Sequence, residues 1–248
     1  MNRIRIIATA TVLAVAGCAK APAAVITRVP HDLITLPVDV AAPAFFRETF
    51  DGPLEEQQWR EVEVNGRGEY TVQRSSDGNR WLQALSQSTA SILLCPVTFH
   101  PDAYEWLSWR WKVDRPVPAE NLYTKQGSDA AARVYVYFET KSRLPWAKRN
   151  LDYVWSAHLP VGTVLSSPYA ASSKIIVVNS GNEHLGQWRT VVRNLEDDYH
   201  RCFDGPLPRV VGIGLMTDSD NTNSESAAAF DDVIISHQVP RDPDGAGS

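Results

Sequence analysis

The pattern that most constrains the fold is a series of short segments, rich in Val, Ile, Trp and Tyr, in which apolar residues alternate with polar ones or follow one another. Clusters of Gly, Pro, Asn, Asp and Ser separate these segments. A period of two is typical of β-strands, because successive side chains point to opposite faces of a sheet. The segments are residues 45–50, 61–64, 70–74, 81–85, 91–96, 107–113, 133–139, 153–158, 174–179, 188–194, 210–216 and 232–237. This series predicts an all-β fold in which two sheets pack as a sandwich.

One segment, residues 195–203, has helical spacing instead. Leu195 and Tyr199 fall on one face of such a helix, and three acidic residues fill its first turn, where the helix dipole favours negative charge. Asn194 precedes the segment as a candidate N-cap. We therefore expect one short helix that connects two strands.

The N-terminus has the composition of a bacterial export signal. Two arginines within the first five residues precede an apolar run over residues 6–16, which is too short to span a membrane as a helix. The sequence Val15-Ala16-Gly17-Cys18 closes this run and resembles the lipobox of bacterial lipoproteins, where the cysteine is acylated and begins the mature protein. Cleavage within residues 21–24 is the alternative, and it would release a protein without lipid.

These signals predict the location of the protein and its domain boundaries. By resemblance to lipoprotein sorting rules, Ala19 in place of an aspartate after Cys18 indicates an outer-membrane lipoprotein on the periplasmic face of the bacterial envelope. We expect a lipoprotein signal peptide at 1–17, a flexible tether at 18–43, the β-sandwich domain at 44–238 and a disordered tail at 239–248.

The charge of the chain limits its partners. The formal net charge is −5 at pH 7, and loss of Arg3 and Arg5 with the signal peptide makes the mature chain more negative. Nucleic acid and anionic lipid headgroups are therefore poor partners. We expect contact with the membrane through the lipid anchor only.

The cysteines fit an oxidising compartment. Acylation of Cys18 leaves Cys95 and Cys202 as an even pair, for which a disulfide is one interpretation. Cys95 follows an apolar run and Cys202 precedes Phe203, surroundings in which free buried thiols are common. Both interpretations stay open at this point.

Alternation within two predicted strands assigns their faces. In residues 107–113, Trp109 and Trp111 fall on the face predicted to be buried. In residues 133–139, the buried set is Val134, Val136 and Phe138. If both strands belong to one sheet, its outer face collects positive charges and aromatic rings, which suit sugar rings and their hydroxyl or carboxylate groups. This candidate ligand-binding face consists of Arg110, Lys112, Arg133, Tyr135 and Tyr137. The alternative is a solvated face with cross-strand pairs.

Several segments together resemble a known family. They are residues 107–113, 128–136, 153–155, 197–199, 212–222 and 230–233. They resemble the bacterial envelope family catalogued as domain of unknown function 3047, over roughly residues 45–236. The resemblance implies an envelope location and a sandwich fold, and no established activity. The chain departs from the family pattern at Cys202, where a small apolar residue is usual.

A second resemblance concerns the two ends of the domain. Residues 46–50 and 230–235 are similar to the first and last strands of jelly-roll carbohydrate-binding modules, which implies a jelly-roll-like two-sheet β-sandwich. In such modules a structural Ca²⁺ commonly lies between these strands, which makes Glu48 and Asp231 or Asp232 candidate ligands. Residues 217–225 also gather oxygen atoms of the kind that Ca²⁺ prefers, although they lack the spacing of an EF-hand. The alternative is a polar turn at the end of a strand.

Signatures of enzymes are scarce. The sequence contains no Gly-x-Ser-x-Gly elbow, no His-Glu-x-x-His and no phosphate-binding loop. A carboxylate pair for glycoside chemistry is conceivable among Asp129, Asp218 and Asp220. Asp129 precedes Arg133 by four residues, and an ion pair between them is the interpretation that we favour.

The acidic residues near the end of the chain need a counter-charge. We favour arginines over a metal ion for Asp218 and Asp220, with Arg133 and Arg193 as candidates, because a guanidinium binds two carboxylate oxygens and the loop lacks a dedicated Ca²⁺ spacing.

Together these patterns lead to a functional hypothesis. We expect an envelope lipoprotein whose β-sandwich binds a cell-envelope or extracellular glycan without catalysis. A hydrolase or lyase that acts on polysaccharides is the first alternative, and a structural envelope protein with a protein partner is the second. No cofactor is expected beyond the candidate Ca²⁺.

Overall fold

The computed structural model describes residues 44–54, 58–140 and 149–240. The predicted signal peptide, the tether with Cys18 and most of the predicted tail lie outside these residues. Within the described part of the chain, no helix is long and apolar enough to cross a membrane.

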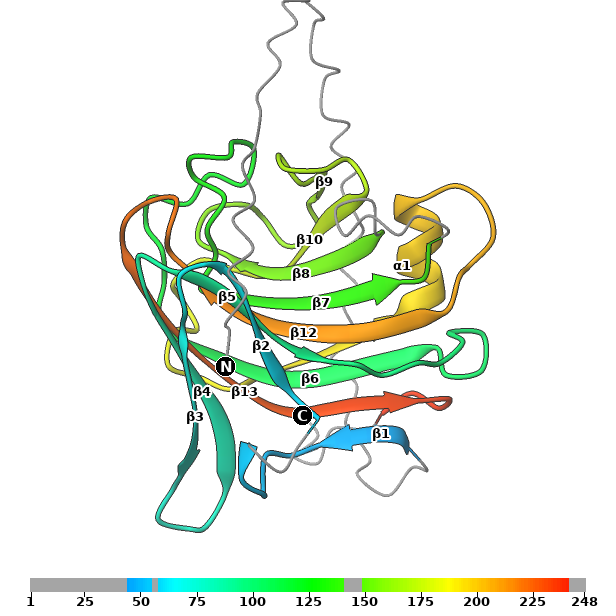
Figure 1. Cartoon of the computed structure of the whole chain (residues 1–248), viewed down its shortest axis with the longest axis horizontal. Coiled ribbons are helices and arrows are strands. Elements are labelled where there is room, and N and C mark those ends of the chain that lie inside the picture. Colours follow the sequence, from blue (N-terminus) through cyan, green and yellow to red (C-terminus); the bar gives the residue numbers. More distant parts are fainter. Residues whose placement is uncertain (1–43, 55–57, 141–148, 241–248) are drawn as a thin grey trace, which may run out of the picture.

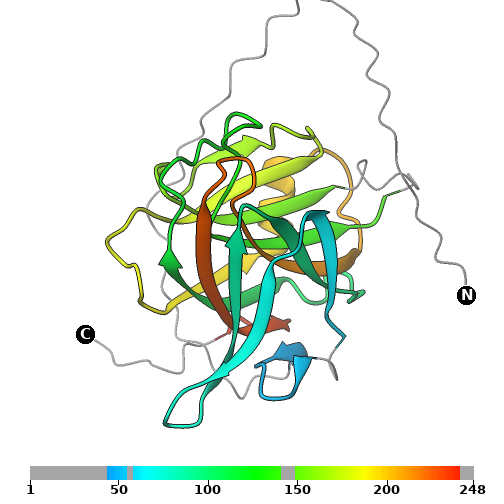
Figure 2. The same cartoon turned by 60° about the vertical axis from the view of Figure 1, so that its left-hand side comes forward.

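The predicted two-sheet, jelly-roll-like β-sandwich is confirmed. Sheet A has the order β11 (Arg189–Asn194), β6 (Trp106–Arg115), β13 (Glu225–Ser236), β4 (Arg80–Gln87) and β3 (Glu69–Arg74), and β1 (Ala44–Glu48) also pairs with β13. Sheet B has the order β2 (Arg60–Asn65), β5 (Ala90–Cys95), β12 (Val210–Asp218), β7 (Ala132–Phe138), β8 (Asn150–Ser156), β10 (Ser173–Ser180) and β9 (Val164–Ser166). Figure 1 shows the two layers, with β7, β8 and β12 above β6 and β13. The hairpin of β3 and β4 reaches out from the sandwich in both views (Figure 1, Figure 2).

The strands of sheet B include a parallel pair. β8 and β10 run parallel, whereas the other strand pairs of the described residues are antiparallel. A parallel neighbour requires a connection that returns the chain to the same end of the sheet. Residues 157–172 make this connection and include β9.

Aromatic rings of both sheets form the core. Trp109 and Trp111 of β6 are fully buried, as predicted. The ring centroids of Trp109 and Tyr153 on β8 lie 5.3 Å apart, and those of Trp111 and Phe230 on β13 lie 6.4 Å apart. The predicted inward residues of β7, Val134, Val136 and Phe138, are also fully buried.

The predicted helix is α1 (Leu195–Cys202). The side chain of Asn194 caps it by accepting a hydrogen bond from the backbone N–H of Asp197 over 3.0 Å. Tyr199 is buried and its ring lies 4.9 Å from that of Phe138, so α1 packs against the end of β7 (Figure 1).

The largest differences from the predicted strands occur at β9 and β13. β9 is only three residues long and was not predicted. β13 begins at Glu225, well before the predicted start at Asp232. The prediction missed its first half because this half is rich in alanine, which has a low β propensity. These small residues lie between β4 and β6, where Ala228 pairs with Ala84 and Val113 and is fully buried.

Both cysteines of the domain are free. Cys95 is buried in β5 and Cys202 is half-buried at the end of α1. Each thiol packs against the hydrophobic core from its own element, so the disulfide interpretation is wrong. Burial raises the pKa of Cys95 to about 11 and that of Cys202 to about 12.

Candidate ligand-binding pocket

The predicted ligand-binding face is split between two surfaces. β6 belongs to sheet A and β7 to sheet B, and the inward residues of both strands face the same core from opposite sides. The outward residues therefore point away from each other. Arg110 and Lys112 lie on the outer face of sheet A, whereas Arg133, Tyr135 and Tyr137 lie on that of sheet B. The prediction of one shared face is wrong.

The sheet A half of the predicted face surrounds a tryptophan. The guanidinium carbon of Arg110 and the Nζ of Lys112 lie 5.3 Å and 5.8 Å from the ring centroid of Trp188. Trp81 meets the same ring edge-on. The two cations thus cover apolar rings, which is a common arrangement of long charged side chains.

The sheet B half contributes to a cavity of about 260 Å³ on the outer face of this sheet, which we call the outer pocket. Its lining includes Arg133 and Tyr135 of β7, Asp152 of β8, Asp218 of β12, and Tyr169 and Asp220 of adjoining loops. Small-molecule sites typically measure roughly 300–1,000 Å³, so the outer pocket suits a ligand of about one ring.

Two glycines of β12 make room for tyrosine rings beside the outer pocket. Gly212 and Gly214 pair across the sheet with Tyr137 and Tyr135, whose rings stack with centroids 5.6 Å apart. A Cβ atom on Gly214 would lie only 2.8 Å from Cγ2 of Ile92 and 3.3 Å from Cε2 of Tyr137. The sequence pairs two large side chains with two glycines, so that the rings pack where β12 has no side chain on this face.

Arg133 is the buried centre of the outer pocket. Its Nε donates to Oδ1 of Asp218 over 3.0 Å, its Nη1 donates to Oδ2 of Asp152, and its Nη2 donates to the carbonyl oxygen of Ser128 over 2.9 Å. The prediction that Arg133 supplies the counter-charge of Asp218 is confirmed. With every guanidinium nitrogen donating to a protein oxygen, Arg133 is held rigidly.

The two carboxylates bonded to Arg133 are poorly solvated. Burial raises the pKa of Asp152 to about 6 and that of Asp218 to about 7, and the attraction of Arg133 opposes the rise in both. Asp152 is 2% exposed, and its Oδ1 atom has no hydrogen-bond partner. A buried acceptor without a donor destabilises the folded state, so this oxygen would gain from a hydrogen-bond donor.

Asp129 has a different role from the predicted ones. Its carboxylate is fully buried and accepts hydrogen bonds from the backbone and side chain of Asn221 and from those of Thr222. The predicted ion pair of Asp129 with Arg133 is therefore wrong. Asp129 instead fixes the turn that follows β12.

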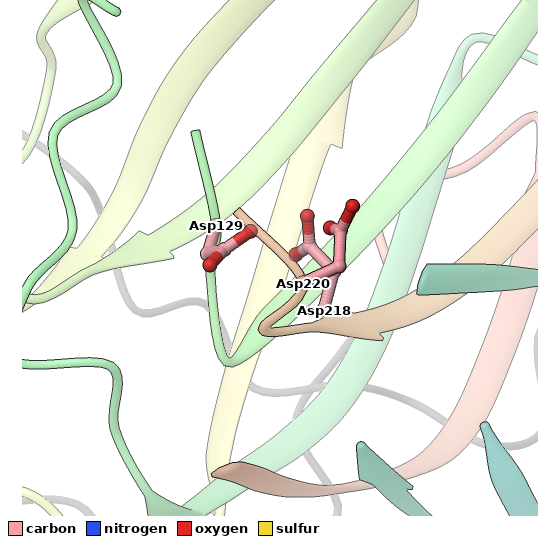
Figure 3. A group of neighbouring side chains, drawn as sticks. All are labelled: Asp129, Asp218 and Asp220. Carbon is pink, nitrogen blue, oxygen red and sulfur yellow. The ribbon is translucent and has the colours of Figure 1, made fainter. Parts of the chain in front are cut away.

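Asp129, Asp218 and Asp220 lie close together, with carboxylate oxygens within 4.8 Å of one another. Figure 3 shows Asp129 on the segment before β7, Asp218 at the end of β12 and Asp220 on the turn that follows. Asp220 accepts from Nδ2 of Asn65 and Nδ2 of Asn221, each over 2.9 Å. Amide donors thus replace the arginine predicted for Asp220. Protein donors and Arg133 already bind oxygens of all three carboxylates, so they do not form a dedicated metal site.

The other predicted arginine, Arg193, binds elsewhere. It forms a bidentate ion pair with Asp198 of α1, which also accepts from the hydroxyl of Tyr153. The predicted role of Arg193 beside Asp218 and Asp220 is wrong, because its strand lies at the edge of sheet A.

The residues predicted to bind Ca²⁺ have hydrogen-bond partners within the protein. The carboxylate of Glu48 accepts from the backbone N–H of Phe50 over 2.7 Å and from Nε1 of Trp59 over 2.9 Å. Asp232 pairs with Arg110 over 3.2 Å, and Asp231 accepts from the backbone N–H of Asp232. Both carboxylate oxygens of Glu48 and one oxygen of each aspartate thus bind protein donors.

Sequence reasoning missed two important residues of the outer pocket. Asp152 alternates with the buried residues Leu151 and Tyr153, so the period of two could have placed it on the outer face. Tyr169 lies in the connection between β8 and β10 and is 55% exposed. Its position depends on the path of this connection, for which the sequence has no periodic signal.

Comparisons with known proteins concern the family and distant structures. A family model described as protein of unknown function (DUF3047) matches residues 57–234, well over half of the chain. No curated protein matches the chain.

Solved structures resemble the chain at low sequence identity. The enzymatically active domain of bacteriophage CBA120 tailspike protein 4 is 10% identical, with a TM-score of 0.35 over 72% of this chain, which spans only 19% of that chain. A family 30 carbohydrate-binding module is 14% identical, with a TM-score of 0.39 over 78% of this chain and 99% of that chain. The xyloglucanase domain of NopAA from Sinorhizobium fredii is 10% identical, with a TM-score of 0.41 over 72% and 92%. What the outer pocket binds therefore has to be inferred from its own side chains.

Proposed function

The chain belongs to the family described as protein of unknown function DUF3047, and we propose that its outer pocket binds one sugar unit of a cell-envelope or extracellular glycan. The observation that carries this proposal is a cavity that combines the rings of Tyr135 and Tyr169 with a buried acceptor, Oδ1 of Asp152, that has no partner in the protein. A sugar unit presents apolar C–H faces to rings and hydroxyl donors to carboxylates.

Other polar residues of the lining fit the same ligand class. Ser128, Ser167, Ser173 and Asn221 line the outer pocket together with its carboxylates. Hydroxyl and amide groups both donate and accept, as sugar hydroxyls do, so that several hydrogen bonds can form at once.

Glycan binding can be tested with two tyrosines of similar exposure. Tyr169 is 55% exposed and lines the outer pocket, whereas Tyr123 is 45% exposed and lies outside its lining. We expect Tyr169→Ala to lower the affinity for glycans that an array identifies by about fivefold, since stacking on one ring contributes on the order of 1 kcal/mol. Tyr123→Ala should leave the affinity unchanged. Equal effects of both variants would exclude the outer pocket, and an array without any binding would favour a protein partner.

A second candidate function is glycan cleavage. Burial raises the pKa of Asp218 to about 7, the range that suits a general acid, and Asp220 lines the same cavity. Asp129 no longer belongs to this hypothesis, since loop donors occupy its oxygens. The measurement is the release of new reducing ends from a bound glycan. Release that Asp218→Asn abolishes would establish catalysis, and no release over prolonged incubation would leave binding alone.

The location of the protein is part of the same proposal. The sequence Val15-Ala16-Gly17-Cys18 supports acylation at Cys18, which would tether the domain to the periplasmic side of the outer membrane. A palmitate analogue should label the wild-type protein in cells and not Cys18→Ser. Equal labelling of both proteins, or of neither, would end this part of the proposal.

A further inference from the structure

The charge of the outer pocket is unbalanced. Three carboxylates, those of Asp152, Asp218 and Asp220, line it, and Arg133 is the one cationic side chain among the described residues of the lining. Lys125 lies near its rim, with Nζ 5.6 Å from the ring of Tyr169. The lining thus has an excess of negatively ionisable groups.

Arg133 offers little to an anionic ligand. Its Nε, Nη1 and Nη2 all donate to protein oxygens, and its side chain is 3% exposed. Its positive charge is therefore already paired with the carboxylates of Asp152 and Asp218. A ligand carboxylate would meet buried acceptors and would be repelled.

The unpartnered oxygen of Asp152 indicates that a hydrogen-bond donor is missing from the outer pocket. Asp152 lines the outer pocket, and its buried Oδ1 atom accepts no hydrogen bond. A hydroxyl would supply one donor to it. An ammonium group supplies three N–H donors together with a positive charge, so it can satisfy this oxygen and offset the excess of carboxylates at once.

We propose that the sugar unit bound in the outer pocket is a hexosamine with a free amino group, whose ammonium is received by Oδ1 of Asp152 and by the neighbouring carboxylates. This inference rests on the proposed function and specifies its ligand class. It also predicts that sugars with a carboxylate are excluded.

A set of matched β-1,4-linked oligosaccharides tests the inference by titration calorimetry near neutral pH. The members carry glucosamine, N-acetylglucosamine, glucose or glucuronate units, so that mainly the charge and the substituent differ. We expect the glucosamine oligomer to bind at least about tenfold more tightly than the glucose oligomer, which corresponds to about 1.4 kcal/mol. We expect no measurable binding of the glucuronate oligomer.

Variants locate the preference within the outer pocket. Asp152→Asn replaces the carboxylate that carries the unpartnered oxygen with a neutral amide. The ratio of glucosamine to glucose affinity should therefore fall towards one. If Asp152→Asn fails to fold, the half-buried Asp220→Asn offers the same measurement with a smaller fall. Asp102→Asn removes an exposed carboxylate outside the lining and should leave the ratio unchanged.

The outcomes separate this inference from the proposed function. Equal binding of glucosamine and glucose oligomers, or tighter binding of glucuronate, overturns the amine preference and leaves a sugar pocket. An unchanged ratio in both pocket variants also overturns it. Absence of binding to every oligosaccharide and on the array overturns the proposed function itself.

Discussion

Arg133 of β7 donates from Nε to Oδ1 of Asp218 on β12 over 3.0 Å, and both side chains are almost fully enclosed. The backbone partner of Arg133 on β12 is Met216, so the ion pair reaches two residues further along the neighbouring strand. The same guanidinium binds Asp152 of β8. One side chain thus ties three adjacent strands together at the floor of the outer pocket.

Removing this guanidinium should be costly. We expect Arg133→Met to lower the free energy of unfolding by about 3–5 kcal/mol, because it leaves two buried carboxylates without their counter-charge. Urea unfolding followed by tryptophan fluorescence measures the change. Arg115→Met is the control, since its ion pair with Glu225 is exposed on both sides and should contribute little. Losses of equal size in the two variants would contradict a stabilising role of the buried pair.

The two glycines of β12 that face tyrosine rings should differ in how much their replacement by alanine destabilises the protein. Gly214→Ala should destabilise the protein by about 1–3 kcal/mol, because its Cβ would lie 2.8 Å from a methyl carbon of Ile92 and the neighbouring rings must shift. The nearest atoms to a Cβ on Gly212 lie at 3.3 Å and 3.4 Å, so Gly212→Ala should cost less. Unfolding midpoints of the two variants give the order, and the reverse order would show that the tyrosine rings do not depend on Gly214.

Stability should fall with rising pH through the range in which buried aspartates titrate. Burial and the nearby charge of Asp232 raise the pKa of Asp231 to about 7, against the attraction of Arg110. The native state therefore holds this proton more tightly than the unfolded chain does, and the resulting stabilisation is lost as the pH rises from about 4 to about 7. We expect Asp231→Asn to show a smaller decline of the unfolding temperature over this window than the wild type, with Asp102→Asn as a matched exposed control. Parallel profiles of Asp231→Asn and the wild type would refute the assignment.

The free thiols can be counted directly. In Cys18→Ser protein, alkylation under denaturing and non-reducing conditions should modify both Cys95 and Cys202, as mass spectrometry of the peptides can show. In the folded protein at neutral pH the reaction should be slow, since burial raises the pKa of both thiols. A peptide that links Cys95 to Cys202 would contradict the structure.

Local patterns predicted which way side chains point, and long-range pairing decided what they form together. Alternation correctly placed Trp109 inside and Arg110 outside, since a strand has only two faces wherever it pairs. It could not tell that β6 pairs with β11 and β13 while β7 pairs with β8 and β12. Residues with the same alternation therefore lie on opposite surfaces of the sandwich.

The same limit applies to the acidic residues. The need of Asp218 for an arginine follows from burial of charge, and the sequence identified Arg133 as a candidate. Asp152 binds the same guanidinium from β8, which pairs with β7 in the sheet, and Asn65 reaches Asp220 from β2. Such partners become visible only when the register of the sheets is known.

The parallel pairing of β8 with β10 has a consequence for how relatives of this protein can diverge. Because the chain must cross over between them, residues 157–172 pass beside the outer pocket and contribute Ser167 and Tyr169 to its lining. The ion pairs of Arg133 are made by β7, β8 and β12 and do not involve this crossover. Substitutions and insertions in the crossover can therefore alter ligand choice while the charged floor is inherited unchanged, so evolution can vary specificity separately from stability.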